Sequence, residues 1–189
     1  MNKKTLFSLL LVAVAVYFLF AEFPDNKKAN YQHSDGFIFG TVYSVTYSNP
    51  DNKDLTMQIK NALNVVNNSL SMFNAESTIS KINNNQPVIL DSLFLTVWTK
   101  GQSISQATDG AFDMTVAPLV DLWGFGLKNR EQVTDAEVDS LRQYIGYQLA
   151  VLENNTILKA HPEMRIDAGA IAKGYACDVI ATMLQQHGS

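Results

Sequence analysis

DGAFDMTVAPLVDLWGFG, residues 109–126, is the most informative stretch of this sequence, because turn formers, aromatic rings and acids meet in it. Gly124 and Gly126 flank Phe125, which predicts a bendable aromatic loop that can close over a flat ring system. Asp113 can accept hydrogen bonds from the polar edge of a ligand. A plainer interpretation stays open, in which the three aromatic residues belong to the core and Asp113 caps a turn.

A second stretch, DAGAIAKGYACD at residues 167–178, predicts a site for a diphosphate. Small residues at the start of a helix let a ligand approach free backbone N–H groups, where the helix dipole favours phosphate, and Lys173 adds a positive charge. The stretch is not a P-loop, because Lys173 precedes Gly174 and no hydroxyl residue follows a Gly-Lys pair. The alternative is an ordinary amphipathic helix with Ile171 and Tyr175 inward and Lys173 in solvent.

Hydrophobic spacing and capping signals predict an α+β fold in which helices pack on a mixed sheet. Asp91 is placed to cap one helix, and Thr134 with Glu137 forms a capping box for another. Helices are expected at 54–72, 92–109, 134–144 and 170–186, with a short helical turn after 71–83. Strands are expected at 37–47, 148–152 and 156–159, with a further short one at 165–167.

The N-terminus has the pattern of an export signal. Lys3 and Lys4 precede an uncharged apolar run from Leu6 to Ala21, and a polar, turn-rich segment follows. We therefore expect residues 1–23 to be a signal peptide or an inner-membrane anchor, and residues 24–36 a linker. Positive charge before the run keeps that end in the cytoplasm, so the domain at 37–189 is expected in the periplasm or facing outward from the membrane of a bacterial cell.

The amino-acid composition limits the classes of function that this protein can have. Of the 189 residues, 47% are hydrophobic and 17% charged, which is typical of one packed domain. The net charge of -4 and the scattered basic residues argue against nucleic-acid binding. Cys177 is the single cysteine, so an intrachain disulfide and a cysteine-based zinc cluster are excluded, and we expect a small buried side chain there.

From about Phe37 to its end, the chain resembles the ApbE family of FAD:protein FMN transferases. The resemblance is carried by the stretches 110–126 and 167–178, with weaker support from Phe39-Gly40-Thr41 and from the loop at 71–83. It implies binding of FAD with a divalent metal, usually Mg²⁺. The FMN half is then transferred to a threonine or serine hydroxyl of an acceptor protein, and AMP is released.

The resemblance also implies roles for particular residues. The expected FAD contacts are Phe39, Phe73, Ala111, Phe112, Asp113, Asp167 and Lys173. The backbone oxygen of Ala170 is the expected metal ligand. Phe39 stands where the family commonly has methionine, Phe73 where it has tyrosine, and Ala168 where leucine is more usual. No catalytic base is implied by the residues present.

The family pattern continues past the position of Ser189 with a Gly-Gly-Glu segment and, later, an acid and a hydroxyl residue that complete the metal site. We therefore expect this sequence to hold the N-terminal half of the domain. Two alternatives to transfer stay open, namely hydrolysis of FAD to FMN and AMP, and a non-catalytic FAD-binding protein of the cell envelope. The acceptor protein and the oligomeric state are not predicted.

Overall fold

The computed structural model describes Tyr17, residues 30–125 and residues 133–189. Residues 31–189 form one compact unit, and the description below concerns that unit. The expected signal or anchor at 1–23 lies, apart from Tyr17, outside the described residues, and of the expected linker at 24–36 the structure describes residues 30–36. Across the ranges that are described, no helix combines the length and the apolar character needed to span a membrane.

The unit opens with a β-hairpin, which corrects two expectations. Strand β1 (Tyr31–Ile38) pairs antiparallel with β2 (Thr41–Ser48), so the strand structure begins six residues before Phe37 and the segment expected as linker is partly strand. Phe39 and Gly40 form a two-residue turn with φ of 54° and 72°, where a single strand was expected. A turn with two positive φ values matches the twist of paired strands. Asparagine is the usual first residue of such turns, and the phenylalanine at position 39 therefore gave no indication of a hairpin turn.

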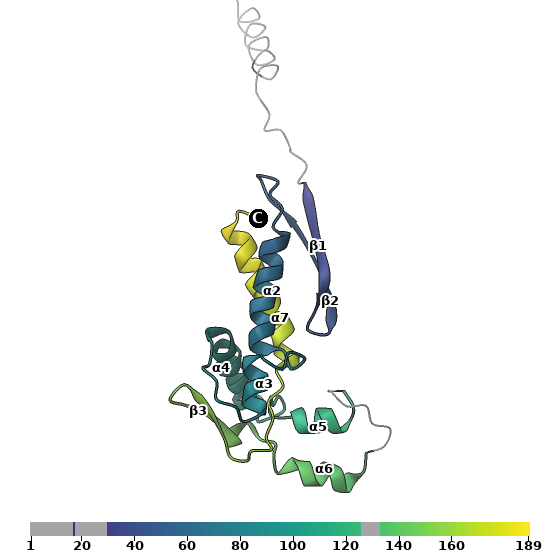
Figure 1. The fold of residues 1–189 in the computed structure, drawn as a ribbon, viewed down its shortest axis with the longest axis vertical. Helices are drawn as coiled ribbons and strands as arrows, with labels where there is room; N and C mark the ends of the chain where they lie inside the picture. The colour runs from purple at the N-terminus through teal and green to yellow at the C-terminus, as the bar shows by residue number, and fades with distance from the viewer. Residues whose placement is uncertain (1–16, 18–29, 126–132) are drawn as a thin grey trace, which may run out of the picture. The chain divides into compact units, whose positions relative to one another are not determined.

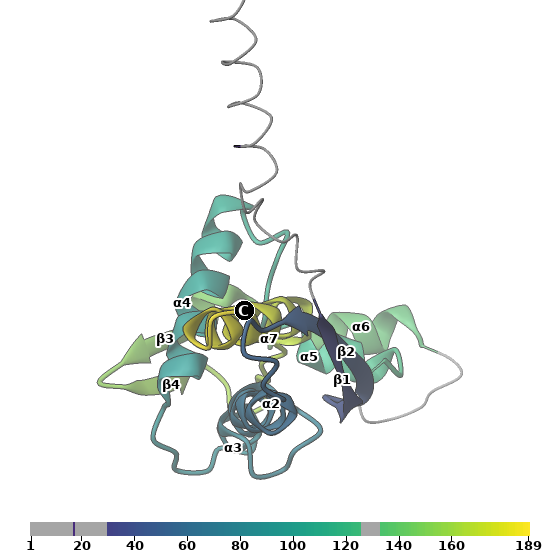
Figure 2. The ribbon, with the colours of Figure 1, turned by 90° about the horizontal axis from the view of Figure 1, so that it is seen from above.

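Three helices make the centre of the unit. They are α2 (Thr56–Leu70), α4 (Ser92–Ala107) and α7 (Gly169–Gln186). Figures 1 and 2 show α2 and α7 side by side, with the hairpin along one flank. The buried side of α7 consists of Ala172, Ala176 and Ile180, whereas Ile171 and Tyr175 are half-buried. Small residues at this contact let the backbone of α7 approach α2 and α4 closely.

The remaining elements surround the lower part of α4 and α7 in Figure 1. They are α3 (Thr78–Asn83), α5 (Ala117–Leu122), α6 (Asp135–Arg142), a 3₁₀ turn (Tyr147–Leu149), β3 (Ala150–Glu153) and β4 (Thr156–Lys159). The strands form two separate antiparallel pairs, β1–β2 and β3–β4, so the α and β elements are confirmed but the described residues contain no mixed sheet. Arg165–Asp167 contributes one parallel bridge, between Arg165 and Val116, in place of the expected strand.

Asp91 fastens three helices together through its carboxylate. Its Oδ1 accepts hydrogen bonds from the Phe94 N–H (2.8 Å), which confirms the expected cap of α4, and from the Ser69 hydroxyl at the end of α2 (2.7 Å). Its Oδ2 accepts one from the Thr78 hydroxyl at the start of α3 (2.6 Å). Burial raises the pKa of Asp91, but these hydrogen bonds outweigh it and hold the pKa below its usual value.

We expect Asp91→Asn to lower the free energy of unfolding by about 1–2 kcal/mol near neutral pH, because an amide cannot accept all three hydrogen bonds. A depressed folded-state pKa gives stability that is present above the unfolded value, near pH 4, and lost as the pH falls through the folded value. Denaturant unfolding from pH 6 to pH 2.5 should therefore show the gap between wild type and variant closing below about pH 4. Asp139→Asn, at an exposed pair with Arg142, is the control. A gap of constant size over this range contradicts the assignment.

Candidate functional site

Asp113 lies in a turn that its own side chain holds in place. Oδ1 accepts hydrogen bonds from the Thr115 N–H and from the Thr115 hydroxyl, both at 2.7 Å. The buried Thr115 hydroxyl in turn accepts the Gly146 N–H at 2.8 Å, which ties the turn to the segment after α6. Within the described residues, Oδ2 of Asp113 has no hydrogen-bond partner. One carboxylate oxygen thus shapes the turn, and the other is available to a ligand.

Asp167 repeats this arrangement just before α7. Its Oδ1 accepts the Gly169 N–H at 2.6 Å, and the part of the chain that the structure covers gives its Oδ2 no hydrogen-bond partner. A Cβ added at Gly169 would lie 2.9 Å from that Oδ1, so the glycine keeps room for the carboxylate. The Gly169 N–H is therefore occupied, which removes it from the set of N–H groups that the helix start offers to a phosphate.

The two stretches singled out in the sequence lie side by side. The Asp167 N–H donates to the Met114 carbonyl at 2.7 Å, and the parallel bridge pairs Val116 with Arg165. Arg165 also forms an ion pair with Asp121 on α5, and both side chains of the pair are half-buried. These contacts place Asp113 and Asp167 on neighbouring backbone segments, although 54 positions separate them in sequence.

Phe39, Phe73 and Lys173 come together around the tip of the hairpin. A Cβ added at Gly40 would lie 3.3 Å from the ring of Phe73, so the ring covers the turn. Phe39 and Lys173 line one groove of about 470 Å³ between β2 and α7. The ammonium of Lys173 lies 3.3 Å from the carbonyl of Gly169, one turn earlier in the helix. Lys173 thus stands between the hairpin tip and the segment that carries Asp167.

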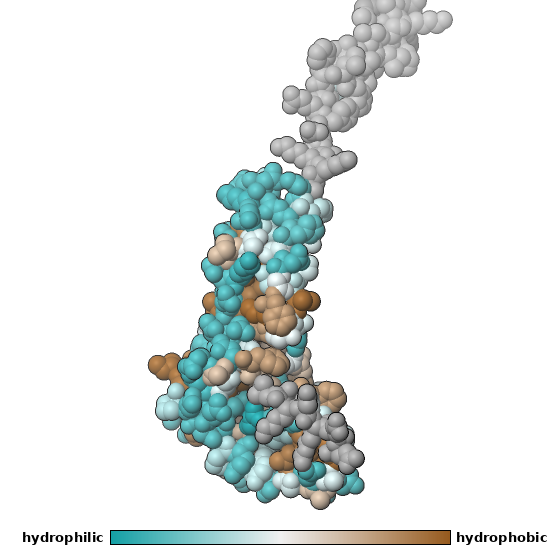
Figure 3. All heavy atoms as spheres, turned by 45° about the vertical axis from the view of Figure 1, so that its right-hand side comes forward, coloured by the Kyte–Doolittle hydropathy of each residue, from teal (hydrophilic) through white to brown (hydrophobic). Residues whose placement is uncertain are grey.

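The aromatic residues of the first stretch differ in their surroundings. Phe112 is half-buried and packs against the core, and its N–H donates to the Thr108 hydroxyl, while the neighbouring Ala111 is exposed. Trp123 is 53% and Phe125 83% exposed, so the interpretation of these two as core residues is wrong. Figure 3, which brings the hairpin side forward, shows apolar atoms gathered midway along that face. Exposed aromatic rings are available to stack on a flat ligand.

Cys177 corrects an expectation made from sequence. It is exposed and not buried, and it lines the groove that Phe39 and Lys173 share. The α7 positions that face the core carry alanine and isoleucine, so the cysteine falls on the outer side of the helix.

A metal site cannot be assembled from the described side chains alone. No group of three or more His, Cys, Asp or Glu side chains in the described ranges is arranged to hold an ion. Ala170, the expected backbone ligand, lies exposed in the first turn of α7, three residues after Asp167. A carbonyl oxygen suits Mg²⁺, but a single carbonyl is a small part of its six-oxygen shell.

A larger groove, of about 690 Å³, runs along β4 and contains none of the expected site residues. Its one basic side chain, Lys159, is already engaged. The Lys159 ammonium donates to the carbonyls of Ile82 (3.1 Å), Pro162 (3.3 Å) and Met164 (2.8 Å). Burial, and secondarily the charge of Arg165, lower the pKa of Lys159. We therefore place the candidate site at Asp113, Asp167 and Lys173 and not in this groove.

Comparison with known proteins places the chain beside one family. The family model described as "ApbE family" matches residues 39–189. The FAD:protein FMN transferase of Vibrio cholerae is 36% identical over 187 residues, which cover 94% of this chain and 55% of the relative. The FAD:protein FMN transferase of Haemophilus influenzae is 29% identical, with 97% of this chain and 56% of the relative covered.

Solved structures show the same similarity. The flavin transferase from Vibrio cholerae superposes with a TM-score of 0.79 at 36% identity, covering 85% of this chain and 55% of that one. The apo form of the flavinyl transferase from Pseudomonas stutzeri gives a TM-score of 0.76 at 26% identity, with 87% and 56% covered. The chain thus spans about half the length of the relatives that it matches.

Proposed function

This chain belongs to the ApbE family, and on that premise we propose that the whole protein transfers the FMN moiety of FAD to a threonine or serine hydroxyl of an acceptor protein. In this reaction the hydroxyl oxygen forms a bond to the phosphorus of the FMN half. The bond from that phosphorus to the bridging oxygen breaks, AMP leaves with this oxygen, and the hydroxyl proton passes to a base. The relatives named above support the reaction class by their names.

One observation carries the proposal for this chain, namely the hydrogen bond between the Asp167 N–H and the Met114 carbonyl. It joins the two stretches of the family pattern and brings together two carboxylates that each keep one oxygen available. Carboxylate oxygens accept hydrogen bonds from the N–H and O–H edges of flavin, ribose or adenine. The pair is therefore suited to orient a dinucleotide, and positioning is the main requirement of phosphoryl transfer.

Lys173 supplies the positive charge in this scheme. Its ammonium is on the exposed side of α7 and is close to the hairpin tip, where Phe39 and Phe73 offer aromatic surface. A bound divalent metal, which we propose to be Mg²⁺ with the Ala170 carbonyl as one ligand, would neutralise charge on the diphosphate. The described residues do not complete such a site, so we name no further ligand.

We propose further that the protein works outside the cytoplasm, as an exported or membrane-anchored enzyme. The support is the basic residues Lys3 and Lys4 followed by the apolar run from Leu6 to Ala21. An acceptor protein in the same compartment follows from this placement.

The test is incubation of the full-length protein with FAD, Mg²⁺ and a candidate acceptor that contains an exposed threonine or serine. Transfer predicts covalent flavin fluorescence on the acceptor in a denaturing gel and one AMP released for each flavin attached. Free FMN with AMP and no labelled acceptor would instead assign the protein as an FAD hydrolase. Intact FAD that stays bound would assign it as a binding protein, and either result overturns the proposal.

A further inference from the structure

Asn83 is buried and joins two parts of the chain that are 83 positions apart. Its Nδ2 donates to the Ile166 carbonyl at 2.9 Å, and its Oδ1 accepts the Ile166 N–H at 2.7 Å. Asn83 is 8% and Ile166 1% exposed. A side-chain amide that pairs with both backbone groups of one residue takes the place of a neighbouring strand.

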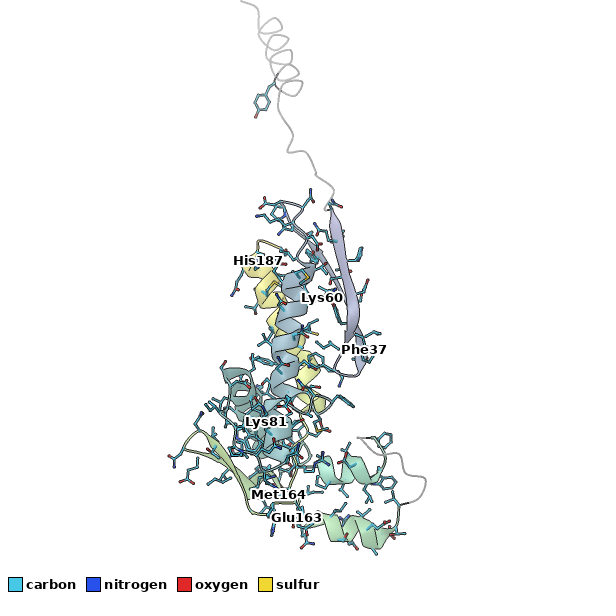
Figure 4. The ribbon with its side chains drawn as sticks, in the orientation of Figure 1. Phe37, Lys60, Lys81, Glu163, Met164 and His187 are labelled. Atoms are coloured by element: carbon cyan, nitrogen blue, oxygen red, sulfur yellow. The ribbon has the colours of Figure 1, made fainter. Side chains whose placement is uncertain are left out.

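The segment that contains Ile166 leads directly to Asp167. On one side Asn83 pairs with Ile166, and on the other the Asp167 N–H donates to the Met114 carbonyl. Figure 4 labels Met164, at the start of this segment, below α3, the helix that ends in Asn83. The segment is therefore held between α3 and the turn that carries Asp113.

We infer that Asn83 is a positioning residue for the flavin site, acting through Asp167. This inference rests on the proposed function, because it takes Asp167 to contact FAD. Asn83 itself does not reach the ligand, since both of its polar groups are bonded to Ile166. Loss of either hydrogen bond leaves a buried backbone group of Ile166 unpaired and lets the segment that contains Ile166 and Asp167 shift. A shift of Asp167 weakens its contact with FAD.

Asn83→Asp is the most direct variant, since it keeps the shape and the acceptor oxygen but removes the donor to the Ile166 carbonyl. We expect the dissociation constant for FAD of the full-length protein to rise about tenfold, the value of a lost buried hydrogen bond. Asn85→Asp is the matched control, because Asn85 donates to the Pro162 carbonyl in the same region but is exposed, and aspartate tolerates its positive φ of 55°. That control should change the dissociation constant less than twofold.

A coupling measurement separates positioning from general stability. In an Asp167→Asn background, Asn83→Asp should weaken FAD binding less than about twofold further, because the contact between the Asp167 carboxylate and FAD is already lost. Additive effects of the two substitutions would overturn the inference, as would equal FAD affinity of Asn83→Asp and wild type. If Asn83→Asp does not fold, Asn83→Ser, which keeps a polar group and leaves room for water, takes its place.

Amide hydrogen exchange without FAD tests the local contact by itself. The Ile166 and Asp167 amides should exchange at least about tenfold faster in the variant, whereas amides in the middle of α2 keep their rates. Unchanged exchange at Ile166 and Asp167 overturns the inference even if transfer is confirmed. If the wild-type protein fails to bind FAD but the exchange rates change as expected, the proposed function is overturned, and with it the role of Asn83 at the flavin site. The structural role of Asn83, which holds Ile166 through two hydrogen bonds, would still be supported.

Discussion

Asp113→Asn and Asp167→Asn are each expected to weaken FAD binding by about 100-fold, because a hydrogen bond to a charged acceptor contributes about 1.5–3 kcal/mol. Asparagine keeps the Oδ1 acceptor that holds the Thr115 turn in one case and the Gly169 N–H in the other. The backbone of each turn is therefore retained, while the second, charged oxygen becomes an amide that donates. The measurement is isothermal titration of the full-length protein with FAD in the presence of Mg²⁺.

Alanine at the same positions separates the two roles of each carboxylate, which are to hold the local turn and to bind FAD. Asp113→Ala removes the partner of the buried Thr115 N–H and should lower the free energy of unfolding by roughly 1–3 kcal/mol in addition to the loss of FAD binding. Asp109→Asn is the control, at an acid four residues before Asp113 for which the structure gives no side-chain hydrogen bond among the described residues. If both asparagine variants bind FAD like wild type, the two carboxylates do not contact the ligand and the site assignment is wrong.

Local signals account for the parts of the fold that the sequence predicted well. Asp91 and the pair Thr134 with Glu137 cap their helices as expected, because a cap is decided by residues within one turn. The strands expected at 148–152 and 156–159 are present as β3 and β4, and they pair through a turn in which Asn154 and Asn155 tolerate the left-handed conformation. In each case the conformation is decided by a few neighbouring residues and not by distant contacts.

The elements that were missed depend on contacts far along the chain or on weak local patterns. Strand β1 is polar in its centre, and pairing with β2 stabilises it where its own residues do not. Helix α5 has six residues, and Pro118 in its first turn suits a helix start as well as a loop. Neither case offers the long hydrophobic period from which helices and strands are recognised.

The candidate site was likewise predicted only where the sequence carries a local signal. The family resemblance singled out Asp113, Asp167 and Lys173, but single-residue patterns could not show that the Asp113 and Asp167 segments are neighbours. That neighbourhood depends on the Met114 carbonyl and on Asn83, whose partners are more than 50 positions away. An asparagine at the end of a short helix gives no sequence signal for such a role, because helix ends favour asparagine for local reasons.

Lys173→Met is expected to lower FAD affinity by about 30-fold, because it removes a charge-assisted contact to the diphosphate while keeping an unbranched side chain of similar length. Among the described residues, the Lys173 ammonium forms one hydrogen bond, of 3.3 Å to the Gly169 carbonyl on an exposed face. Its loss should therefore leave the melting temperature nearly unchanged. Lys100→Met, at an exposed position on α4, is the matched control.

Salt dependence makes the Lys173 test specific for charge. The FAD affinity of wild type should fall as NaCl increases from 50 to 500 mM, and the slope should be smaller in Lys173→Met, since one charge that the salt screens has been removed. Lys173→Arg should keep most of the affinity and the wild-type slope. If Lys173→Met binds FAD as tightly as wild type at 50 mM salt, the phosphates are held elsewhere, and the start of α7 has to be given up as the diphosphate site.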